Sequence, residues 1–201
     1  MKKILNIVSS PRGGASYSIQ LADAIIGKVL AANPGSTVKT VDLVKKHWPH
    51  LEEAHLSSFY TPVDKYTEKD REAVLHSDEA IADIQEADVI VIGAPMYNFN
   101  IHSALKAWID HIIRKEKTFS VTDKGAEGLV RKGKKVYVAL ASGYVYSDGP
   151  MKSMDFIEPY LRTVFGFIGL TDITVFRVEG TAIAGLKDAA LEKAVEGIRV
   201  N

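Results

Sequence analysis

The sequence contains no cysteine and no excess of either charge. The lack of cysteine excludes disulfide frameworks, thiolate-bound zinc or iron–sulfur centres, and any mechanism that uses a thiol nucleophile. Lys and Arg together number 25, Asp and Glu together number 25, and the formal net charge is +0. Because a nucleic-acid-binding domain usually presents a basic surface to the phosphates, we expect no nucleic-acid partner.

Long apolar runs are also missing from the sequence. No stretch approaches the roughly 20 consecutive apolar residues of a membrane-spanning helix. The apolar segment Ile4–Val8 is too short for a signal peptide, is interrupted by Asn6 and runs into Pro11 without a small-residue cleavage site. We therefore expect no membrane partner and a cytoplasmic location.

The composition of the 201 residues, 46% hydrophobic and 25% charged, predicts one globular domain over residues 1–201. Four short, β-branched apolar runs predict strands that are buried on both faces, and a fifth, more alternating run predicts a strand near an edge. The four are Ile4–Val8, Val89–Ile92, Val136–Leu140 and Ile173–Val178, and the fifth is Thr37–Leu43.

Segments with helical periodicity separate these runs. One spans Ile19–Leu30, a second begins after Thr67 as its cap, and a third contains Leu105–Ile112. A fourth covers Phe156–Ile168 and ends at Gly169, and a short last one lies within Leu186–Ile198. This alternation predicts an α/β fold, a doubly wound five-stranded parallel sheet with helices on both faces.

Two stretches do not fit the alternation. Lys45–Lys65 is polar, rich in His and Pro, and contains Trp48, Phe59 and Tyr60, so we expect a long loop there. Thr118–Gly133 is predicted to be an excursion or hairpin. Long loops in compact domains are usually functional covers or partner contacts.

Ligands of doubly wound sheets bind beyond the carboxyl ends of the strands, where the strand order reverses. In the five-strand order 2-1-3-4-5, that point lies between the first and third strands. The loop after the first strand, residues 9–18, offers serine hydroxyls, glycines and Arg12 at the start of a helix, which is typical of a phosphate site. It lacks the P-loop and the G-x-G-x-x-G patterns, so a phosphate monoester fits better than a triphosphate or a dinucleotide. A plain turn and helix cap would explain the same residues.

The loop after the third strand, Pro95–Ile101, has two aromatic residues, a methionine and two carboxamides. Apolar side chains can cover the face of a flat heteroaromatic ligand, while amides satisfy its ring nitrogens and carbonyls. The alternative is that Tyr97 and Phe99 anchor the loop to the core. Together with the phosphate loop, this loop favours FMN as the ligand.

At this point the residues resemble the FMN-dependent NADH-azoreductases, a family of dimeric flavodoxin-like enzymes that also reduce quinones. The resemblance covers nearly the whole chain, and its most specific element is Met96-Tyr97-Asn98-Phe99. It is carried further by Ser9-Ser10-Pro11-Arg12, Ser16-Tyr17-Ser18, Leu105-Lys106, Ile109-Asp110, Gly125–Leu129, Asp148-Gly149-Pro150 and Pro159-Tyr160-Leu161.

The resemblance implies FMN-binding residues in three loops. Those for the phosphate and ribityl chain are Ser10, Ser16, Tyr17 and Ser18, and those for the isoalloxazine are Met96, Tyr97, Asn98 and Phe99.

The third of these loops departs from the family pattern. The family usually has Ser-Arg-Gly-Gly after the fourth strand, whereas this chain has Ser142-Gly143-Tyr144-Val145. We expect Ser142, Gly143 and Tyr144 to lie at the flavin edge, with altered electrostatics on the substrate side. Tyr144 and Tyr146 could equally be ordinary half-exposed loop residues.

The six histidines do not predict a metal site. His47, His50 and His55 cluster without matching carboxylates or an H-E-x-x-H pattern, so we interpret them as part of a solvated polar loop. His102 and His111 are nine positions apart on one helical segment and are not expected to form a pair.

The resemblance therefore implies a homodimeric enzyme that uses NADH, through one FMN per subunit, to reduce quinones and aromatic azo compounds by a ping-pong mechanism. No side chain is required as an essential acid or base, because the cofactor carries the chemistry. Apolar residues outside the predicted core favour the dimer. They are Trp48, Phe59, Tyr60, Phe119 and Val121.

Three other functions suit a domain of this topology. A flavodoxin-type electron carrier without its own NADH oxidation is the alternative, although the neutral charge balance disfavours it. A response-regulator domain needs acidic residues after the first strand, where this chain has Ser9 and Ser10. A low-molecular-weight phosphatase needs a cysteine nucleophile, and the chain has none.

Overall fold

The computed structural model describes residues 1–200 and contains a five-stranded parallel sheet in the order β2-β1-β3-β6-β7. The predicted doubly wound sheet is thus confirmed, with the expected weak strand, β2, at one edge. The strands are β1 (Lys3–Val8), β2 (Thr37–Asp42), β3 (Val89–Pro95), β6 (Lys135–Ala141) and β7 (Asp172–Val178).

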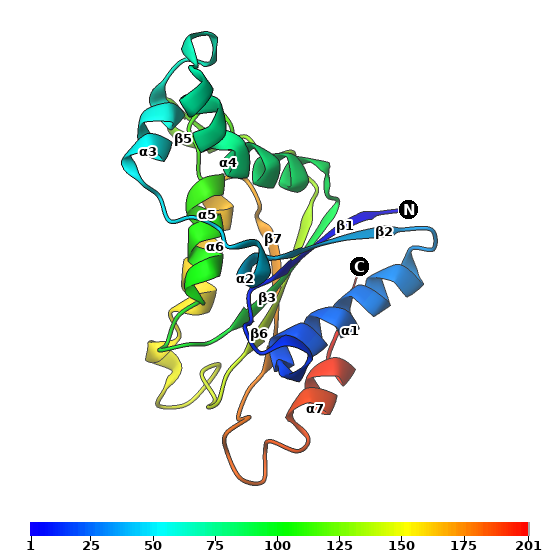
Figure 1. Ribbon diagram of the computed structural model, residues 1–201. Coiled ribbons are helices and arrows are strands. Elements are labelled where there is room, and N and C mark those ends of the chain that lie inside the picture. The colour runs from blue at the N-terminus through cyan, green and yellow to red at the C-terminus, as the bar shows by residue number, and fades with distance from the viewer. Residues whose placement is uncertain (201) are drawn as a thin grey trace.

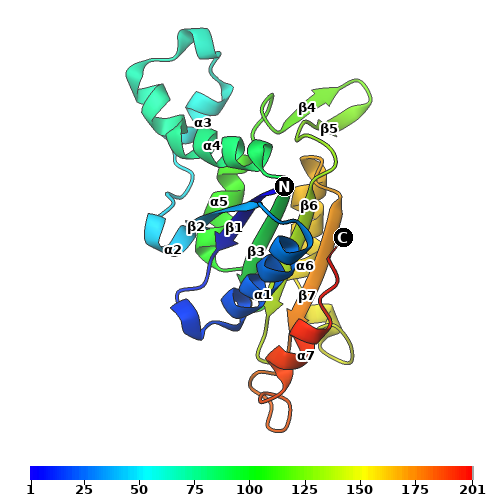
Figure 2. The same ribbon diagram turned by 90° about the vertical axis from the view of Figure 1, so that its right-hand side faces the viewer.

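Helices cover both faces of the sheet, as Figures 1 and 2 show. One face carries α1 (Tyr17–Ala32) and α7 (Ala190–Glu196). The other carries α4 (Glu68–Glu86), α5 (Ser103–Ile112) and α6 (Ile157–Phe167), and the short α2 (Leu43–Lys46) contributes to that core. No helix in residues 1–200 is both long enough and apolar enough to cross a membrane.

The pleat of the strands explains why the core has two halves. Successive side chains of a strand point to opposite faces. Ile4 and Val89 therefore pack against α1, whereas Leu5 and Ile90 pack on the α4–α5 side. Both faces are apolar, which is why the strands are continuous hydrophobic runs.

Local sequence signals fix the helix ends where they were expected. Thr67 caps α4, and Asp70 in turn accepts a hydrogen bond from the Thr67 amide in a capping box. Asn33 caps the end of α1. Gly169 follows α6 with φ +100°, a conformation that is easy only for glycine.

The segment 45–65 is not the long loop that its polarity predicts. It contains α3 (Glu53–Tyr60) and a 3₁₀ turn at Val63–Lys65. The other excursion is a hairpin, as expected, made of β4 (Phe119–Thr122) and β5 (Gly125–Gly128). Both α3 and this hairpin lie at the end of the molecule where the strands of the sheet begin (Figures 1 and 2).

We refer to residues 47–66, with the side chains of His76, Ser77, Asp78, His111 and Arg114 that pack on them, as the α3 lobe. Its centre is a group of rings. Trp48 and His55, expected to be surface residues of a polar loop, are instead buried around His111, which is 5.0 Å from His55 between ring centroids. The prediction was wrong because α3 buries the polar side chains His55 and Ser58 and exposes Leu56 and Tyr60, so hydrophobic periodicity does not indicate its buried face.

Candidate functional site

Three loops leave neighbouring strands at the carboxyl edge of the sheet: residues 9–16 after β1, 96–102 after β3 and 142–147 after β6. We call them the carboxyl-edge loops. β1, β3 and β6 are adjacent, with Val8 paired to Gly93 and Pro95 paired to Ala141. The chain turns from β1 to β2 on one side and to β3 on the other, so the order reverses where it was predicted to.

The first loop buries four serines that the sequence placed at the phosphate site or beside it. Ser9 Oγ donates to the Gly93 carbonyl at 2.6 Å, which joins this loop to β3. Ser10 Oγ accepts from the Arg12 amide at 3.3 Å. Ser16 Oγ and Ser18 Oγ lie 3.0 Å apart and bond to each other. These two hydroxyls thus have each other as partner rather than a backbone group that would hold them in place.

The amino end of α1 is open to an anion. Ser16 is the N-cap residue, but its side chain makes no capping hydrogen bond. The first amides of a helix have no partners within the helix and carry the positive end of its dipole. Gly93 of β3 lies against this end, since a Cβ there would be in ordinary contact, 3.4 Å, with the Ser18 carbonyl oxygen. Uncapped amides beside buried hydroxyls are a donor set that fits a phosphate.

The second loop is a tight turn with an unusual backbone. Tyr97 and Asn100 exchange two backbone hydrogen bonds of 2.9 and 3.0 Å. The residues between them, Asn98 and Phe99, have φ of +49° and +68°, as in a type I′ turn. An aromatic residue rarely adopts this conformation, and such strain persists where the surroundings impose it. The turn leaves the Phe99 side chain 45% exposed, so Phe99 is not simply an anchor to the core.

Side chains around this turn form a cavity of about 480 Å³. Burial lowers the pKa of His102, whose Nδ1 accepts from the Ala104 amide, so the ring is neutral at neutral pH. Burial, with a contribution from the Asp110 carboxylate, raises the pKa of Tyr160 to about 12, so its phenol remains a donor. The cavity is lined by Tyr97, Asn98, Asn100, Ile101, His102, Ser103, Lys106 and Tyr160.

The third loop is pinned at its start and exposes a tyrosine. The Ser142 amide donates to the Val178 carbonyl at 2.9 Å, and Ser142 Oγ donates to the Tyr144 carbonyl at 2.8 Å. The Gly143 carbonyl accepts a hydrogen bond from the Ala182 amide. The Tyr144 side chain is 52% exposed. Met96 joins the second loop to this one, since its amide donates to the Ala141 carbonyl at 2.8 Å.

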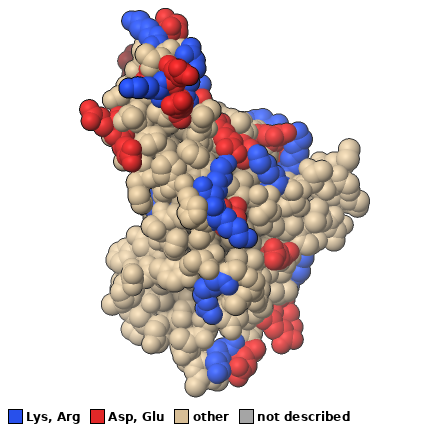
Figure 3. All heavy atoms as spheres, in the orientation of Figure 1, with Lys and Arg blue, Asp and Glu red and all other residues tan. Residues whose placement is uncertain are grey.

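The face of the molecule in Figure 3 has an uneven charge distribution. Charged side chains gather over the α3 end, whereas the opposite, lower part carries few of them. An uncharged surface beside the carboxyl-edge loops suits an aromatic ligand or another apolar surface.

Comparisons with known proteins agree with this geometry. A family model described as flavodoxin-like fold matches residues 2–200. A protein of Herminiimonas arsenicoxydans named FMN-dependent NADH:quinone oxidoreductase is 49% identical over 91% of this chain and 89% of its own length. A protein of the same name from Mesorhizobium japonicum is 43% identical over 95% and 91%.

The chain belongs to this flavodoxin-like family.

Solved structures of the family superpose closely. An azoreductase from Bacillus anthracis has a TM-score of 0.86 and 29% identity, with 98% of each chain covered. A second, titled as an FMN-dependent NADH-azoreductase of Bacillus anthracis in complex with FMN, has a TM-score of 0.85 and 25% identity over 98% of this chain and 97% of that one.

Sequence analysis missed two residues that shape the flavodoxin-like site. Tyr146 is buried, and its ring packs edge-on against Phe99 with centroids 6.4 Å apart. Glu179, just after β7, accepts hydrogen bonds from the amides of Tyr146 and Ser147. The sequence did not predict that Tyr144 or Tyr146 would be buried. For Glu179, the only signal in the sequence was its position as an acidic residue at the end of an apolar run.

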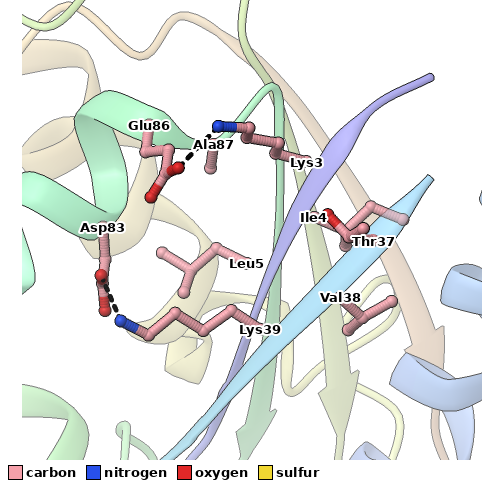
Figure 4. A pocket seen from close by; sticks show the side chains of 9 residues that line it. All are labelled: Lys3, Ile4, Leu5, Thr37, Val38, Lys39, Asp83, Glu86 and Ala87. Carbon is pink, nitrogen blue, oxygen red and sulfur yellow. Dashed lines mark hydrogen bonds and ion pairs between the residues drawn. The ribbon is translucent and has the colours of Figure 1, made fainter.

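A second cavity, of about 280 Å³, lies near the amino ends of β1 and β2 (Figure 4). Two ion pairs flank it, Lys3 with Glu86 and Lys39 with Asp83, each 2.6 Å long. Because each lysine is already paired with a carboxylate, the cavity offers no free cation to a ligand. It lies at the opposite end of the strands from the carboxyl-edge loops.

Some histidines lie where the sequence predicted them and others do not. His47 and His50 are exposed, as predicted, but His55 and His111 are buried together in the α3 lobe. His102 lies apart from His111 and packs against Tyr97. Among residues 1–200, no group of three or more His, Asp or Glu side chains is arranged to hold a metal ion.

Proposed function

We propose that this protein is an FMN-dependent NADH:quinone oxidoreductase that also reduces aromatic azo compounds. The observation that carries the proposal is the juxtaposition of an uncapped, serine-rich helix end and a strained aromatic turn, on adjacent strands at the point where the sheet order reverses. Relatives of 43–49% identity bear the quinone oxidoreductase name, and structural neighbours bear the azoreductase name.

Each loop has a separate part in holding FMN. Ser10, Ser16, Tyr17 and Ser18, with the first amides of α1, bind the phosphate and the ribityl chain. The turn residues Met96, Tyr97, Asn98 and Phe99 hold the isoalloxazine, and Ser142, Gly143 and Tyr144 lie at its edge. The hydroxyls of Ser16 and Ser18 support this arrangement, because both are buried and bonded only to each other among the described residues.

When bound, FMN accepts a hydride from NADH and passes two electrons to the acceptor. The net reaction with a quinone is NADH, a proton and quinone giving NAD⁺ and hydroquinone. Cleavage of an azo bond to two amines consumes two NADH and two protons. The side chains bind and orient the reactants and exclude water, and none need supply a covalent step.

One open face of the ring determines the kinetic order. Residues 96–99 would hold the isoalloxazine from one side, so donor and acceptor would bind in turn at the side left open. We expect double-reciprocal plots against NADH at several quinone concentrations to be parallel, with quinone inhibiting competitively at high concentration. Intersecting lines would require a ternary complex and would contradict the single-face site.

We also propose that two copies associate as a homodimer in which each completes the other's site. Of the five apolar residues that motivated this expectation, Trp48 is buried within its own chain, but Tyr60 is 77% and Val121 60% exposed. In a two-fold symmetric dimer, the α3 end of one protomer can cover the carboxyl-edge loops of the other. Light scattering at micromolar concentration should give twice the monomer mass, and a fully active monomer would contradict the proposal.

The decisive test of the proposed function is simple. The purified protein should show a flavin absorption spectrum, release FMN on heating, and oxidise NADH when a quinone is added. A protein that binds FMN but does not oxidise NADH would instead be a flavodoxin-type electron carrier. Since its donor is an intracellular cofactor, we place the enzyme in the cytoplasm.

A further inference from the structure

A largely buried arginine on the edge strand connects three separate segments of the chain. The guanidinium of Arg177 contacts the carboxylates of Asp155 at 2.5 Å, of Glu179 at 3.4 Å, and of Glu158. Asp155 ends the segment that follows β6, Glu158 lies in α6, and Glu179 follows β7. Arg177 therefore ties the segment 143–156 to the sheet.

Two of these carboxylates also bind backbone at either end of that segment. Glu179 Oε1 accepts from the amides of Tyr146 at 2.8 Å and Ser147 at 3.0 Å, and Glu179 Oε2 accepts from Ser147 Oγ. Asp155 Oδ1 accepts from the amides of Ile157 and Glu158 and so starts α6. Arg177 thus fixes residues 146–147 and residue 155 through one charged group.

The tie extends from Glu179 to the strained turn. Tyr146, whose amide Glu179 holds, packs its buried ring edge-on against Phe99 at an interplanar angle of 78°. Phe99 has φ +68°, and the ring of Tyr146 is an aromatic neighbour of this strained residue. A chain of direct contacts therefore runs from Arg177 through Glu179 and Tyr146 to Phe99.

The start of the same loop is held by other groups. The Ser142 carbonyl accepts from the amide and the hydroxyl of Thr181, and the Gly143 carbonyl accepts from the Ala182 amide. These contacts do not involve Arg177 or Glu179. Loss of the arginine should therefore disturb Tyr146 and Phe99 more than Ser142 and Gly143.

We propose that Arg177 and Glu179 are positioning residues for the wall of the site that the strained turn and the loop after β6 form together. They hold Tyr146 against Phe99 and fix the course of the chain from the exposed Tyr144 onward. The proposal rests on the proposed function for its kinetic consequences, but its structural part can be measured without catalysis. It assigns a role to a buried charge cluster that the phosphate-binding loop does not use.

The test compares variants of the cluster with a matched control. Arg177→Met and Glu179→Ala break the tie, whereas Glu179→Gln keeps an oxygen that accepts from both amides. Arg162→Met is the control, because Arg162 binds the same Glu158 from the more exposed side at 2.7 Å and also donates to the Ile173 carbonyl. It makes the same change of charge within the same cluster.

We expect Arg177→Met and Glu179→Ala to raise the KM for NADH and for the quinone about tenfold, as for the loss of a hydrogen bond to a charged group. The kcat should change less than about threefold, and the Kd for FMN should rise as well, because Phe99 lies in the turn that we place against the isoalloxazine. Glu179→Gln should restore most of the KM, and Arg162→Met should leave it unchanged. In hydrogen exchange, the amides of Tyr146 and Ser147 should lose protection only in the first two variants.

Folded Arg177→Met and Glu179→Ala proteins with wild-type KM and wild-type exchange at residues 146–147 would overturn the proposal. So would an equal effect of Arg162→Met. If Arg177→Met does not fold, the contrast between Glu179→Ala and Glu179→Gln decides. If the wild type neither retains FMN nor oxidises NADH, the proposed function fails, and the exchange measurement still supports or overturns the tie itself.

Discussion

The carboxyl-edge loops and the α3 lobe lie at opposite ends of the sheet, and both bury polar side chains (Figure 1). In the lobe most of these groups satisfy one another, and Trp48 Nε1 and His111 Nδ1 are the buried side-chain atoms without a partner among its described residues. Arg114 donates to Asp78 at 2.6 Å, to Ser77 at 3.2 Å and to the Tyr66 hydroxyl at 2.8 Å. In the edge loops, Ser16 and Ser18 bond to each other and the helix end beside them is uncapped.

The difference separates stability from function. A buried polar group with protein partners stabilises the fold that it helps to form, whereas one without them is costly until something else binds it. The sites of ligand binding are therefore sought where donors converge and remain available. Substitutions in one region or the other test this contrast, because they should affect FMN affinity and stability differently.

The largest effect is expected from removing the two buried hydroxyls of the first loop. Ser16→Ala combined with Ser18→Ala should weaken FMN binding about a hundredfold or more, because each hydrogen bond to a charged group contributes roughly 1.5–3 kcal/mol. Isothermal titration calorimetry of the apoprotein with FMN measures this loss of affinity. The matched control is Ser58→Ala in the lobe, whose hydroxyl donates to the Ala54 carbonyl and to Asp70. It should lower stability by about 1 kcal/mol and leave FMN affinity unchanged, and equal FMN retention by both proteins would reject the phosphate assignment.

In the α3 lobe, a substitution should lower stability and leave FMN affinity unchanged. Arg114→Met should lower the free energy of unfolding by about 2 kcal/mol, since it leaves the buried partners of the guanidinium without a donor. FMN affinity of the folded protein should not change. Urea unfolding measures the loss, and Arg131→Met is the comparison, because its exposed pair with Asp88 should contribute less than about 1 kcal/mol. An equal loss in the two variants would mean that the lobe network adds no more to stability than an exposed ion pair.

At the strained turn, one substitution should raise the stability of the apoprotein and lower its affinity for FMN, and both effects should be smaller. Phe99→Gly creates Asn-Gly, the sequence that type I′ turns favour, so the apoprotein should gain up to about 1 kcal/mol in stability. The same change removes the ring that we place against the isoalloxazine and Tyr146, so FMN affinity should fall. Thermal unfolding with and without FMN checks both. A variant that is less stable without FMN would show that Phe99 serves the core rather than the ligand.

The sequence predicted the edge loops better than the lobe, for a physical reason. Strand periodicity and the fixed hand of crossover connections place the ends of β1 and β3 side by side, so the loops that carry Ser16 and Phe99 could be assigned to adjacent strands from the sequence alone. No such rule joins residue 55 to residue 111. Their contact depends on how α3 docks, and the buried side chains of α3 are the polar His55 and Ser58. Glu179 was missed for the same reason, because its partners at residues 146–147 are 32 or more positions away.

The smallest effect concerns pH and His111, which with Trp48 is one of the two described side chains of the lobe that leave a buried polar atom without a partner. His111 Nε2 lies 3.1 Å from the Pro49 carbonyl, which can only accept, so Nε2 carries the proton. Nδ1 is buried without a hydrogen-bond partner among the described residues. Protonation would place a second N–H there with no acceptor.

Burial accordingly lowers the pKa of His111, with smaller contributions in the same direction from His55 and His76, and burial likewise lowers the pKa of His76. The unfolded chain then binds more protons than the folded one below the ordinary value of 6.5, so stability present above that pH is lost as the pH falls through it. We expect the melting temperature of the wild type to fall between pH 7.5 and 5.5, above the range in which carboxylates titrate. His111→Gln, whose amide can still donate to Pro49, should show a shallower slope, and identical slopes would mean that this ring does not couple folding to pH.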